Sequence, residues 1–570
     1  MEIKRIILSV IATVWIVGAF AQPDHVINVE GERKVEYAAR IPIYPKVIDT
    51  NVNVVNVNYP LLAIKMETQT EMEKINPASV KINEKLPQLY NSYIKLGIGT
   101  ELMPLGEFYY NSDRSRKYVY GAHIKHLSSL GYINGYAPAS FDRTSSMIYG
   151  GINEKRYDLI GQVDYANRGL HYYAIPVDTI SKDSIAQRYS DFGFNVRYRS
   201  HIKDSAKVNY SIGATYRNFL SKKPLADSLR DWRARENYIA FTGNVFYKLN
   251  KETYALDIDV KNNSYKYGIA DSSLTAIDTG LVLNNTIVSL KPTITTRLKD
   301  NRFAAKIGVD LTLDAHNKTS FYIYPIAEVK YSMFNDIFIP YLGLRGGLKQ
   351  NTFRTLTLTN EFILPNIQLK NESTSIDFYG GIKGTLSKRV NFNISASFAN
   401  VKNQALFVND TLYARGNAFS VIYDTITTRT TIEGSVSYQV MEKLKVDGIA
   451  RYYSYSLLNN SYAWNLPQLQ FILRGSYNLF DKFLINLDFK LEQGRKALLY
   501  TAEEGSFVEN GQNIKDLGLI ADANLGLEYR YNKRISAFFQ MNNFAAQRYK
   551  RWYNAPVHGF QVMGGITFRF

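Results

Sequence analysis

The sequence predicts an all-β protein whose strands close into one antiparallel transmembrane barrel. Three observations lead to this prediction: apolar and polar residues alternate along many segments, turns rich in Asn, Asp and Lys recur between these segments, and the last strand ends on an aromatic residue. Alternation with period two gives a strand two faces in different surroundings. Repeated over hundreds of residues, the pattern favours a barrel with lipid outside and water inside over a soluble sandwich.

The composition agrees with this fold class. No Pro- or Ser-rich linker divides the 570 residues, and aromatic residues make up 14%, with 43 Tyr and 30 Phe against 4 Trp. Such an excess is typical of strands and of the aromatic girdles at a membrane boundary. The mean hydropathy of −0.23 is that of a soluble protein, but half of the residues in a barrel strand face water.

Charge and cysteine usage exclude several function classes. The net charge of +17 is spread over single Lys and Arg residues in turns and on polar strand faces, whereas nucleic-acid binding requires a basic patch. We therefore expect no nucleic-acid partner. The absence of Cys excludes disulfides, thiolate metal sites, catalytic thiols and the lipidated cysteine of a bacterial lipoprotein.

Residues 1–21 read as a signal peptide. A basic start precedes an apolar run over residues 6–17, and Ala19 and Ala21 fit the small-x-small pattern of a cleavage site. The apolar run is about a dozen residues long, whereas a membrane-anchoring helix needs about 20. The mature chain is therefore expected in the bacterial envelope, with no transmembrane helix.

Residues 22–90 differ from the rest of the chain. Short β-like runs at residues 26–29 and 51–58 are separated by prolines. We interpret this segment as a small periplasmic or lumen-threading module. Disorder is the alternative, because short polar strands bury little core. Residues 91–570 are then the barrel.

The strands of the barrel can be assigned from their alternation. In residues 483–492, apolar side chains at the odd positions alternate with polar side chains at most even positions, and residues 192–199, 254–261 and 391–398 repeat the pattern. The polar faces supply the following candidate lumen-lining residues: Arg197, Arg199, Asp257, Asp259, Lys261, Asn486, Asp488, Lys490 and Glu492. As a set they could shape the electric field along a transport path; alternatively, they solvate and brace the inner wall.

Tight turns give the strand number. They are predicted at residues 112–114, 153–155, 203–205, 250–252, 299–301, 335–336, 388–389, 442–443, 481–482 and 532–534. Asn and Asp suit short hairpins. Longer connections are predicted at residues 129–143, 176–187, 220–233, 268–280, 349–373, 403–423, 498–515 and 545–557. This pattern predicts about 22 strands, with short periplasmic turns and long extracellular loops.

The long loops carry aromatic residues that could contact a ligand. Tyr172, Tyr173, Phe407, Tyr413, Trp552 and Tyr553 belong to this group. They could stack on a sugar or contact a partner protein. Lining the membrane interface is the alternative.

The final residues form a strand with one aromatic face. Phe560, Phe568 and Phe570 share this face, and the chain stops on the aromatic. The ending resembles the terminal strand of bacterial outer-membrane barrels, which their assembly machinery reads as an insertion signal. The alternative is the last strand of a soluble sheet.

The first hairpin adds a second resemblance. Residues 93–100 form one strand, residues 101–104 turn at once, and residues 105–110 return. This tight opening, the strand number and the Phe-Arg-Phe ending resemble the barrel of TonB-dependent receptors, and residues 93–127 look like the plug-poor members of Bacteroidetes-type bacteria. The resemblance implies a conduit or receptor that passes or binds a solute through its lumen.

The sequence departs from that family at the plug domain. Residues 22–90 are far fewer than the family's plug, and no clear TonB box follows the cleavage site. Energy-coupled import therefore does not follow from the resemblance. The alternative function is a non-transport barrel subunit that partners other envelope proteins in assembly, secretion or surface attachment.

The sequence shows no catalytic constellation. His123 and His126 are the only close pair of histidines, and a spacing of three places them on opposite faces of a strand. No Ser-His-Asp spacing or glycine-rich phosphate loop is evident. We expect no enzymatic activity, cofactor or metal. The expected partners are outer-membrane lipid, the barrel-assembly machinery, and TonB or other envelope proteins, in the outer membrane of a Gram-negative bacterium.

Overall fold

The structure is a computed structural model that describes residues 89–570. Within that range the residues left out are 114, 177–179, 203–207, 222–232, 268–280, 299–301, 317, 411–415, 501–505 and 510. The predicted signal peptide, with Ala19 and Ala21, and residues 22–88 of the predicted N-terminal segment lie outside the described residues. Asn91–Phe570 belong to one compact unit. The division into domains otherwise stays a prediction.

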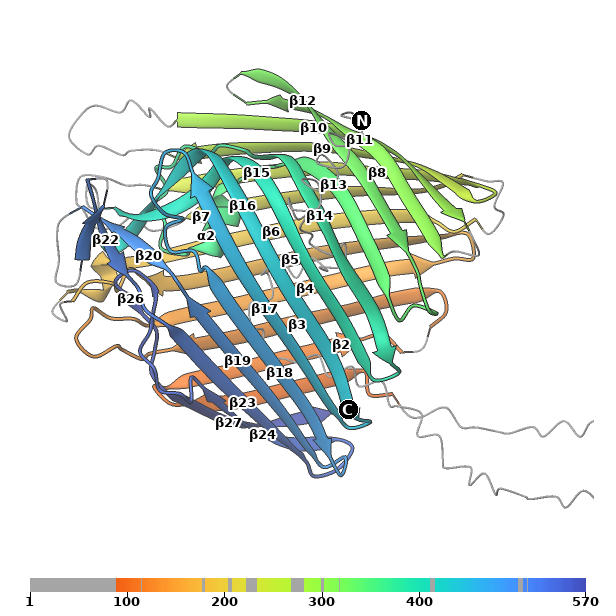
Figure 1. Cartoon of the computed structure of the whole chain (residues 1–570). Helices are drawn as coiled ribbons and strands as arrows, with labels where there is room; N and C mark the ends of the chain where they lie inside the picture. The colour runs from red at the N-terminus through yellow and green to blue at the C-terminus, as the bar shows by residue number, and fades with distance from the viewer. Residues whose placement is uncertain are drawn as a thin grey trace, which may run out of the picture. The chain divides into compact units, whose positions relative to one another are not determined.

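The described residues form a closed antiparallel barrel of 22 strands (Figure 1). The first strand, β1 (Ser92–Gly99), pairs with the last, β27 (Gln561–Arg569), so that Tyr93 lies opposite Arg569 and Gly99 opposite Met563. This pairing removes both sheet edges. The predicted fold class and the predicted number of about 22 strands are confirmed.

The other barrel strands follow one another in chain order. They are β2 (Met103–Asn111), β3 (Tyr118–Ser129), β4 (Phe141–Asn153), β5 (Tyr157–His171), β6 (Ala186–Ser200), β7 (Asn209–Ser221), β8 (Ala234–Leu249), β9 (Glu252–Tyr267), β10 (Leu281–Leu298), β11 (Phe303–Ala315), β12 (Thr319–Tyr331), β13 (Ile339–Lys349), β14 (Glu372–Ser387), β15 (Val390–Asp410), β16 (Ala418–Met441), β17 (Leu444–Leu457), β18 (Leu469–Leu479), β19 (Phe483–Gln493), β23 (Ile520–Arg530) and β24 (Ile535–Asn542).

Small elements occupy the longer connections. They are the 3₁₀ helix η1 (Lys182–Ser184), the α-helix α2 (Phe353–Thr359), a three-stranded sheet of β20 (Lys496–Leu499), β21 (Ser506–Glu509) and β22 (Gln512–Asp516), and a hairpin of β25 (Lys550–Trp552) and β26 (Ala555–Pro556). The described part of the chain contains no helix of the length and apolarity that a bilayer crossing requires.

The opening hairpin has the predicted tight turn. Three residues, Thr100 to Leu102, connect β1 to β2, and Glu101 and Leu102 have positive φ, 61° and 47°. A three-residue connection is one of the common short loops between paired antiparallel strands.

The two faces of the barrel wall have opposite character. Large apolar side chains stay exposed on one face, among them Leu96, Ile148, Phe241, Ile323 and Ile566. Buried polar side chains occupy the positions between them, among them Lys95, Glu107, Asp310, Ser397 and Thr567. Because the sheet closes into a ring, each face of the sheet stays on the same side all the way round. The apolar face is the outer one and the polar face lines the lumen.

One predicted connection is wrong. Residues 403–423 were expected to form a long loop, but β15 and β16 continue through most of it and remain paired up to Asp410 and Ala418. The two strands have 21 and 24 residues, whereas about 9–11 residues cross a membrane. Their paired ends therefore extend past the membrane-spanning part of the wall.

Candidate functional site

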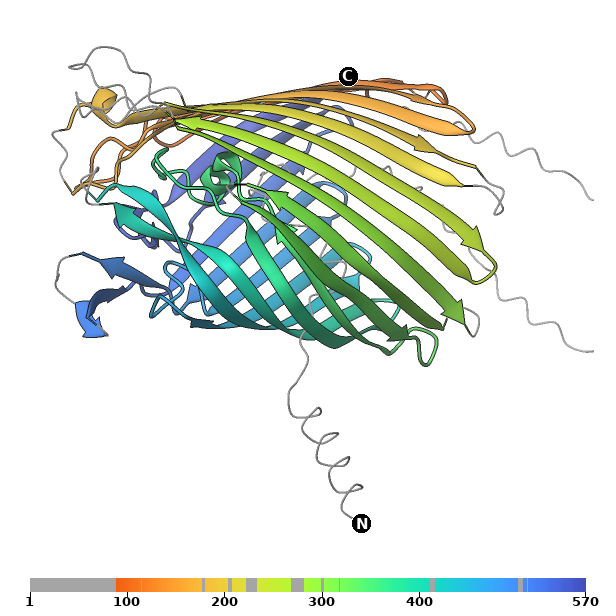
Figure 2. The same cartoon turned by 90° about the horizontal axis from the view of Figure 1, so that it is seen from above.

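The connection between β13 and β14, residues 350–371, folds into the barrel. We call it the crossing loop. Figure 2 shows its helix, α2, inside the ring of strands. Thr352 begins the helix with a capping box: its hydroxyl accepts the N–H of Thr355 at 3.1 Å, and the Thr355 hydroxyl accepts the N–H of Thr352 at 2.9 Å.

The crossing loop reaches the far side of the ring. Its Glu361 pairs with Arg143 of β4 at 3.2 Å, and its Arg354 pairs with Asp191 of β6 at 2.6 Å. In a closed ring of 22 strands, β4 lies almost half-way round from the point where the loop leaves β13. The loop therefore spans the lumen.

A carboxylate of the barrel wall holds the start of α2. Glu236 of β8 is 1% exposed, and its Oε2 accepts the N–H groups of Phe353 at 2.5 Å and Arg354 at 3.4 Å. A negative charge is favourable at this end of a helix, where backbone N–H groups have no partner within the helix. The wall thus fixes where the helix begins.

An ion network extends from the crossing loop into the wall. Asp191 accepts from Arg354 at 2.6 Å and from Arg217 of β7 at 3.4 Å. Arg217 also donates to Asp164 of β5 at 2.9 Å. All four side chains are at most one-quarter exposed, so their attraction is screened less than that of surface pairs.

Three tyrosine hydroxyls bind carbonyl groups of the crossing loop. Tyr172 donates to the carbonyl of Ile363 at 3.0 Å, and Tyr189 to that of Glu361 at 3.1 Å. Tyr265 donates to the carbonyl of Pro365. The carbonyl groups of an irregular loop have no neighbouring strand to supply hydrogen-bond donors. The tyrosine hydroxyls supply donors to these carbonyl groups.

An apolar core surrounds the crossing loop. Its loop members are Phe353, Leu356, Phe362, Ile363, Leu364, Ile367 and Leu369. Its other large members are Tyr172, Tyr189, Phe219, Tyr265, Phe407, Phe419 and Trp552. A barrel lumen is expected to be wet, so this buried cluster closes part of it at the end where the long connections lie.

The predicted role of the loop aromatics is wrong for most of them. Tyr172, Phe407, Trp552 and Tyr553 are buried rather than available to a sugar or the membrane interface. The ring of Trp552 lies 5.3 Å from that of Phe407. Tyr172, Phe407 and Trp552 belong to the apolar core around the crossing loop, whereas Tyr553 packs with Ala497 and Leu499. Tyr413 lies outside the described residues.

The predicted lumen residues lie on the inner face of the wall, by register. The measured contacts are Arg199 to Asp158 at 3.0 Å, Asp259 to Lys291 at 3.1 Å, Asp488 to Arg474 at 3.1 Å, Lys490 to Glu492 at 2.8 Å, and Asn244 to Asp257 at 2.5 Å. Arg197, Lys261 and Asn486 share the face of Arg199, Asp259 and Asp488. Most of the set is thus engaged in bracing the wall, and its role along a path stays a prediction.

The terminal aromatics lie on the outer face. Phe560, Phe568 and Phe570 are exposed, and the rings of Phe568 and Phe570 stack with centroids 5.5 Å apart. Their reading by an assembly machinery stays a prediction.

The histidine pair has separate surroundings. His123 lies 3.1 Å from Glu107 and stacks on Tyr109, whereas His126 contacts Thr144 at 2.8 Å on the other face. Within the described ranges, no three His, Asp or Glu side chains are placed to hold a metal ion.

Comparison of sequences finds no match, whereas comparison of structures finds similar folds. No protein-family model and no curated protein matches the sequence. The structure is similar to the copper transporter OprC (10% identity, TM-score 0.62, 85% of this chain and 82% of that chain). It is also similar to the FrpB iron transporter from Neisseria meningitidis (11% identity, TM-score 0.63, 85% of this chain and 82% of that chain). A third similar structure is the pyoverdine outer membrane receptor FpvA from Pseudomonas aeruginosa PAO1 (11% identity, TM-score 0.61, 85% of this chain and 79% of that chain). The chain therefore has the fold of a TonB-dependent receptor-like outer-membrane barrel.

Proposed function

From this barrel fold, we propose that the protein lies in the outer membrane of a Gram-negative bacterium and binds or passes a solute through its lumen. The observation that carries the proposal is the closed ring of 22 strands with an apolar outer face and a charged inner face. The similar structures support it, since their names describe copper and iron transporters and a pyoverdine receptor.

The crossing loop obstructs this proposed path, so its position determines whether a solute can pass. A solute entering from the side of the long connections meets the crossing loop before the inner wall. The contacts at its far side, Glu361 with Arg143 and Arg354 with Asp191, are polar. Water or a polar solute can replace the more exposed Glu361–Arg143 pair at little net cost, because exposed ion pairs contribute only about 0–1 kcal/mol.

The protein's partners follow from the proposed location. Lipid covers the outer face, and the barrel-assembly machinery inserts the chain. TonB or another envelope protein is the candidate partner for function. One similar structure is a complex of FpvAI with pyocin S2, so a protein ligand is also consistent with this fold.

A second candidate is a non-transport barrel that supports other envelope proteins. The buried apolar core around Phe353, Phe362 and Trp552 favours it, because such a core gives a rigid closure rather than an aqueous passage. An embedded enzyme has less support, since the similar structures are named as a transporter and a receptor.

Planar-bilayer conductance of the refolded full-length protein distinguishes the two. The matched variant replaces residues 353–369 with a short Gly-Ser linker. If the lumen is a path, the variant conducts in long, stable openings and the wild-type protein conducts less. If the variant is folded but silent, and the wild-type protein co-purifies with envelope proteins, the transport proposal is wrong.

A further inference from the structure

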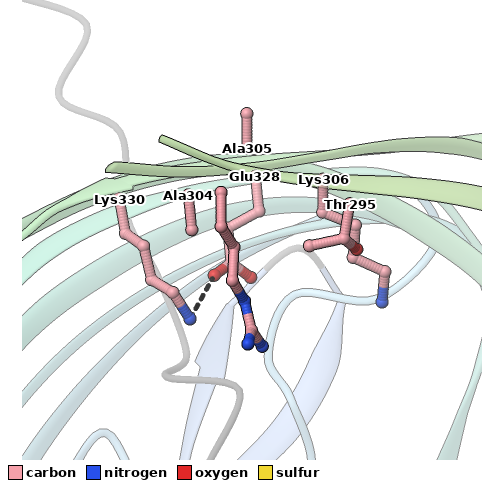
Figure 3. Close-up of a pocket in the computed structure, with 7 residues that line it drawn as sticks. Thr295, Ala304, Ala305, Lys306, Glu328 and Lys330 are labelled. Carbon is pink, nitrogen blue, oxygen red and sulfur yellow. Dashed lines mark ion pairs between the residues drawn. The ribbon is translucent and has the colours of Figure 1, made fainter. Parts of the chain in front are cut away.

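A hollow of about 110 Å³ lies on the inner wall, away from the crossing loop. Its lining residues are Thr295 and Arg297 of β10, Ala304, Ala305 and Lys306 of β11, and Glu328 and Lys330 of β12. In Figure 3, Lys306, Glu328 and Lys330 point together to one side of the wall, and Ala305 points to the other. The register places the charged group on the inner face.

The register explains why the hollow exists. Arg297 lies opposite Ala304, and Ala304 lies opposite Lys330, so these three residues form one row across β10, β11 and β12. Directly opposite residues are about 5 Å apart. Because Ala304 has only a methyl group, space remains between the two long cationic side chains. Its neighbour on the same face, Lys306, closes one side of that space.

The hollow has an excess of positive charge. It contains three cations and one carboxylate, and Lys330 lies 3.8 Å from Glu328. In the part of the chain that the structure describes, neither Arg297 nor Lys306 pairs with a carboxylate. Lys306 lies opposite Glu328 in the register, and the hollow keeps two cations in excess of its one carboxylate. An anion in the hollow would be attracted by this excess.

Elsewhere on strands β10 and β11, cationic side chains are paired with carboxylates. Lys291 of β10 lies 3.1 Å from Asp259 of β9 and 3.8 Å from Asp310 of β11. The excess at the hollow is therefore a local feature of the wall, not a general property of the inner face.

We propose that this hollow binds the anionic group, a carboxylate or a phosphate, of the solute. This inference rests on the proposed function, because it assumes that a solute enters the lumen. It adds that the solute is an anion. Arg297 offers a planar fork of donors that matches either oxyanion, and Lys306 and Lys330 add point charges. Thr295 has a hydroxyl that can donate to a remaining oxygen.

Binding of labelled inorganic phosphate to the refolded full-length protein tests the proposal without requiring conduction. The double variant Arg297→Gln/Lys306→Gln removes two cations, and Ala304→Leu fills the hollow at unchanged charge. The double variant Lys155→Gln/Arg156→Gln is the matched control, since it removes one Lys and one Arg from the exposed turn between β4 and β5.

We expect saturable, salt-sensitive phosphate binding to the wild-type protein and to the control. We expect about a tenfold or greater loss of affinity in Arg297→Gln/Lys306→Gln, because charge-assisted hydrogen bonds are lost, and a comparable loss in Ala304→Leu. Absence of saturable binding to the wild-type protein would overturn the proposal, as would equal losses in the control. A silent bilayer experiment together with intact phosphate binding would refute transport and leave the anion site standing.

Discussion

The carboxylate of Glu236 accepts the backbone N–H of Phe353 at 2.5 Å, although the two residues are 117 positions apart in the chain. A residue of the barrel wall therefore caps the helix of the crossing loop. That helix has 7 residues, which is too short to be stable in isolation. Its helical form depends on the wall, and Glu236 supplies the acceptor for the first N–H groups of the helix.

Replacing Glu236 with Ala is expected to release the crossing loop. The N–H groups of Phe353 and Arg354 would lose their acceptor inside the barrel, at a cost of about 1–3 kcal/mol. If opening and closing are fast compared with cleavage, trypsin should then cut after Arg354 about 5- to 150-fold faster. Limited proteolysis of the folded barrel, followed by mass spectrometry, measures this rate.

Glu433→Ala is the matched control for this experiment. Glu433 is also a buried acidic residue of the inner wall, but its carboxylate pairs with Arg451 of β17 at 2.6 Å. Cleavage after Arg354 should keep its wild-type rate in this variant. Equal acceleration in both variants would mean that the wall is loosened generally and that the cap at Glu236 has no special role.

Arg354 and Asp191 should be energetically coupled. Their 2.6 Å contact joins the crossing loop to β6, and both side chains are largely buried. A double-mutant cycle with Arg354→Met and Asp191→Asn should give a coupling of about 1–3 kcal/mol in the free energy of loop opening. Hydrogen exchange of the amides of α2 measures this free energy. Additive effects of the two substitutions would contradict the contact.

The barrel could be predicted from sequence because its signal is local and repeats. Within β6, Phe194 is exposed to the outside and Asn195 donates to Thr215 on the inside at 2.7 Å. Each such pair of neighbouring residues shows the same alternation of apolar and polar side chains. Because the alternation recurs in many strands, it identifies the fold even where the predicted end of one strand is wrong. The error at residues 403–423 arose because the paired ends of β15 and β16 extend beyond the membrane, where alternation no longer separates lipid from water.

The crossing loop could not be predicted because its contacts are distant in sequence. Arg143 and Glu361 are 218 positions apart, and no periodicity links them. Two local signals were present: Thr352 and Thr355 have the spacing of a helix cap, and the run from Phe362 to Leu364 is too apolar for an exposed loop. Glu236 and Asp191 carry no comparable signal.

The two faces of the wall predict opposite responses to the same substitution. Phe194→Arg places a charge against lipid near the middle of β6 and is expected to cost about 2–4 kcal/mol of unfolding free energy. Asn195→Arg, at the next position, places the same charge against the lumen and should change stability by less than about 1 kcal/mol. Urea unfolding in lipid bilayers measures both. A similar cost for both substitutions would mean that the assigned faces are wrong.

The outward aromatics of β27 should matter for assembly more than for stability. Phe568 and Phe570 are exposed on the outer face near the end of the strand, where the cost of losing contact with lipid is small compared with the bilayer centre. We expect Phe568→Ser/Phe570→Ser to refold spontaneously in detergent to the wild-type yield. In liposomes that contain the barrel-assembly machinery, the same variant should fold several-fold less than the wild-type protein. The heat-dependent shift of the folded barrel on gels measures both yields. An equal loss in detergent and in liposomes would show that the two rings stabilise the barrel and are not an insertion signal.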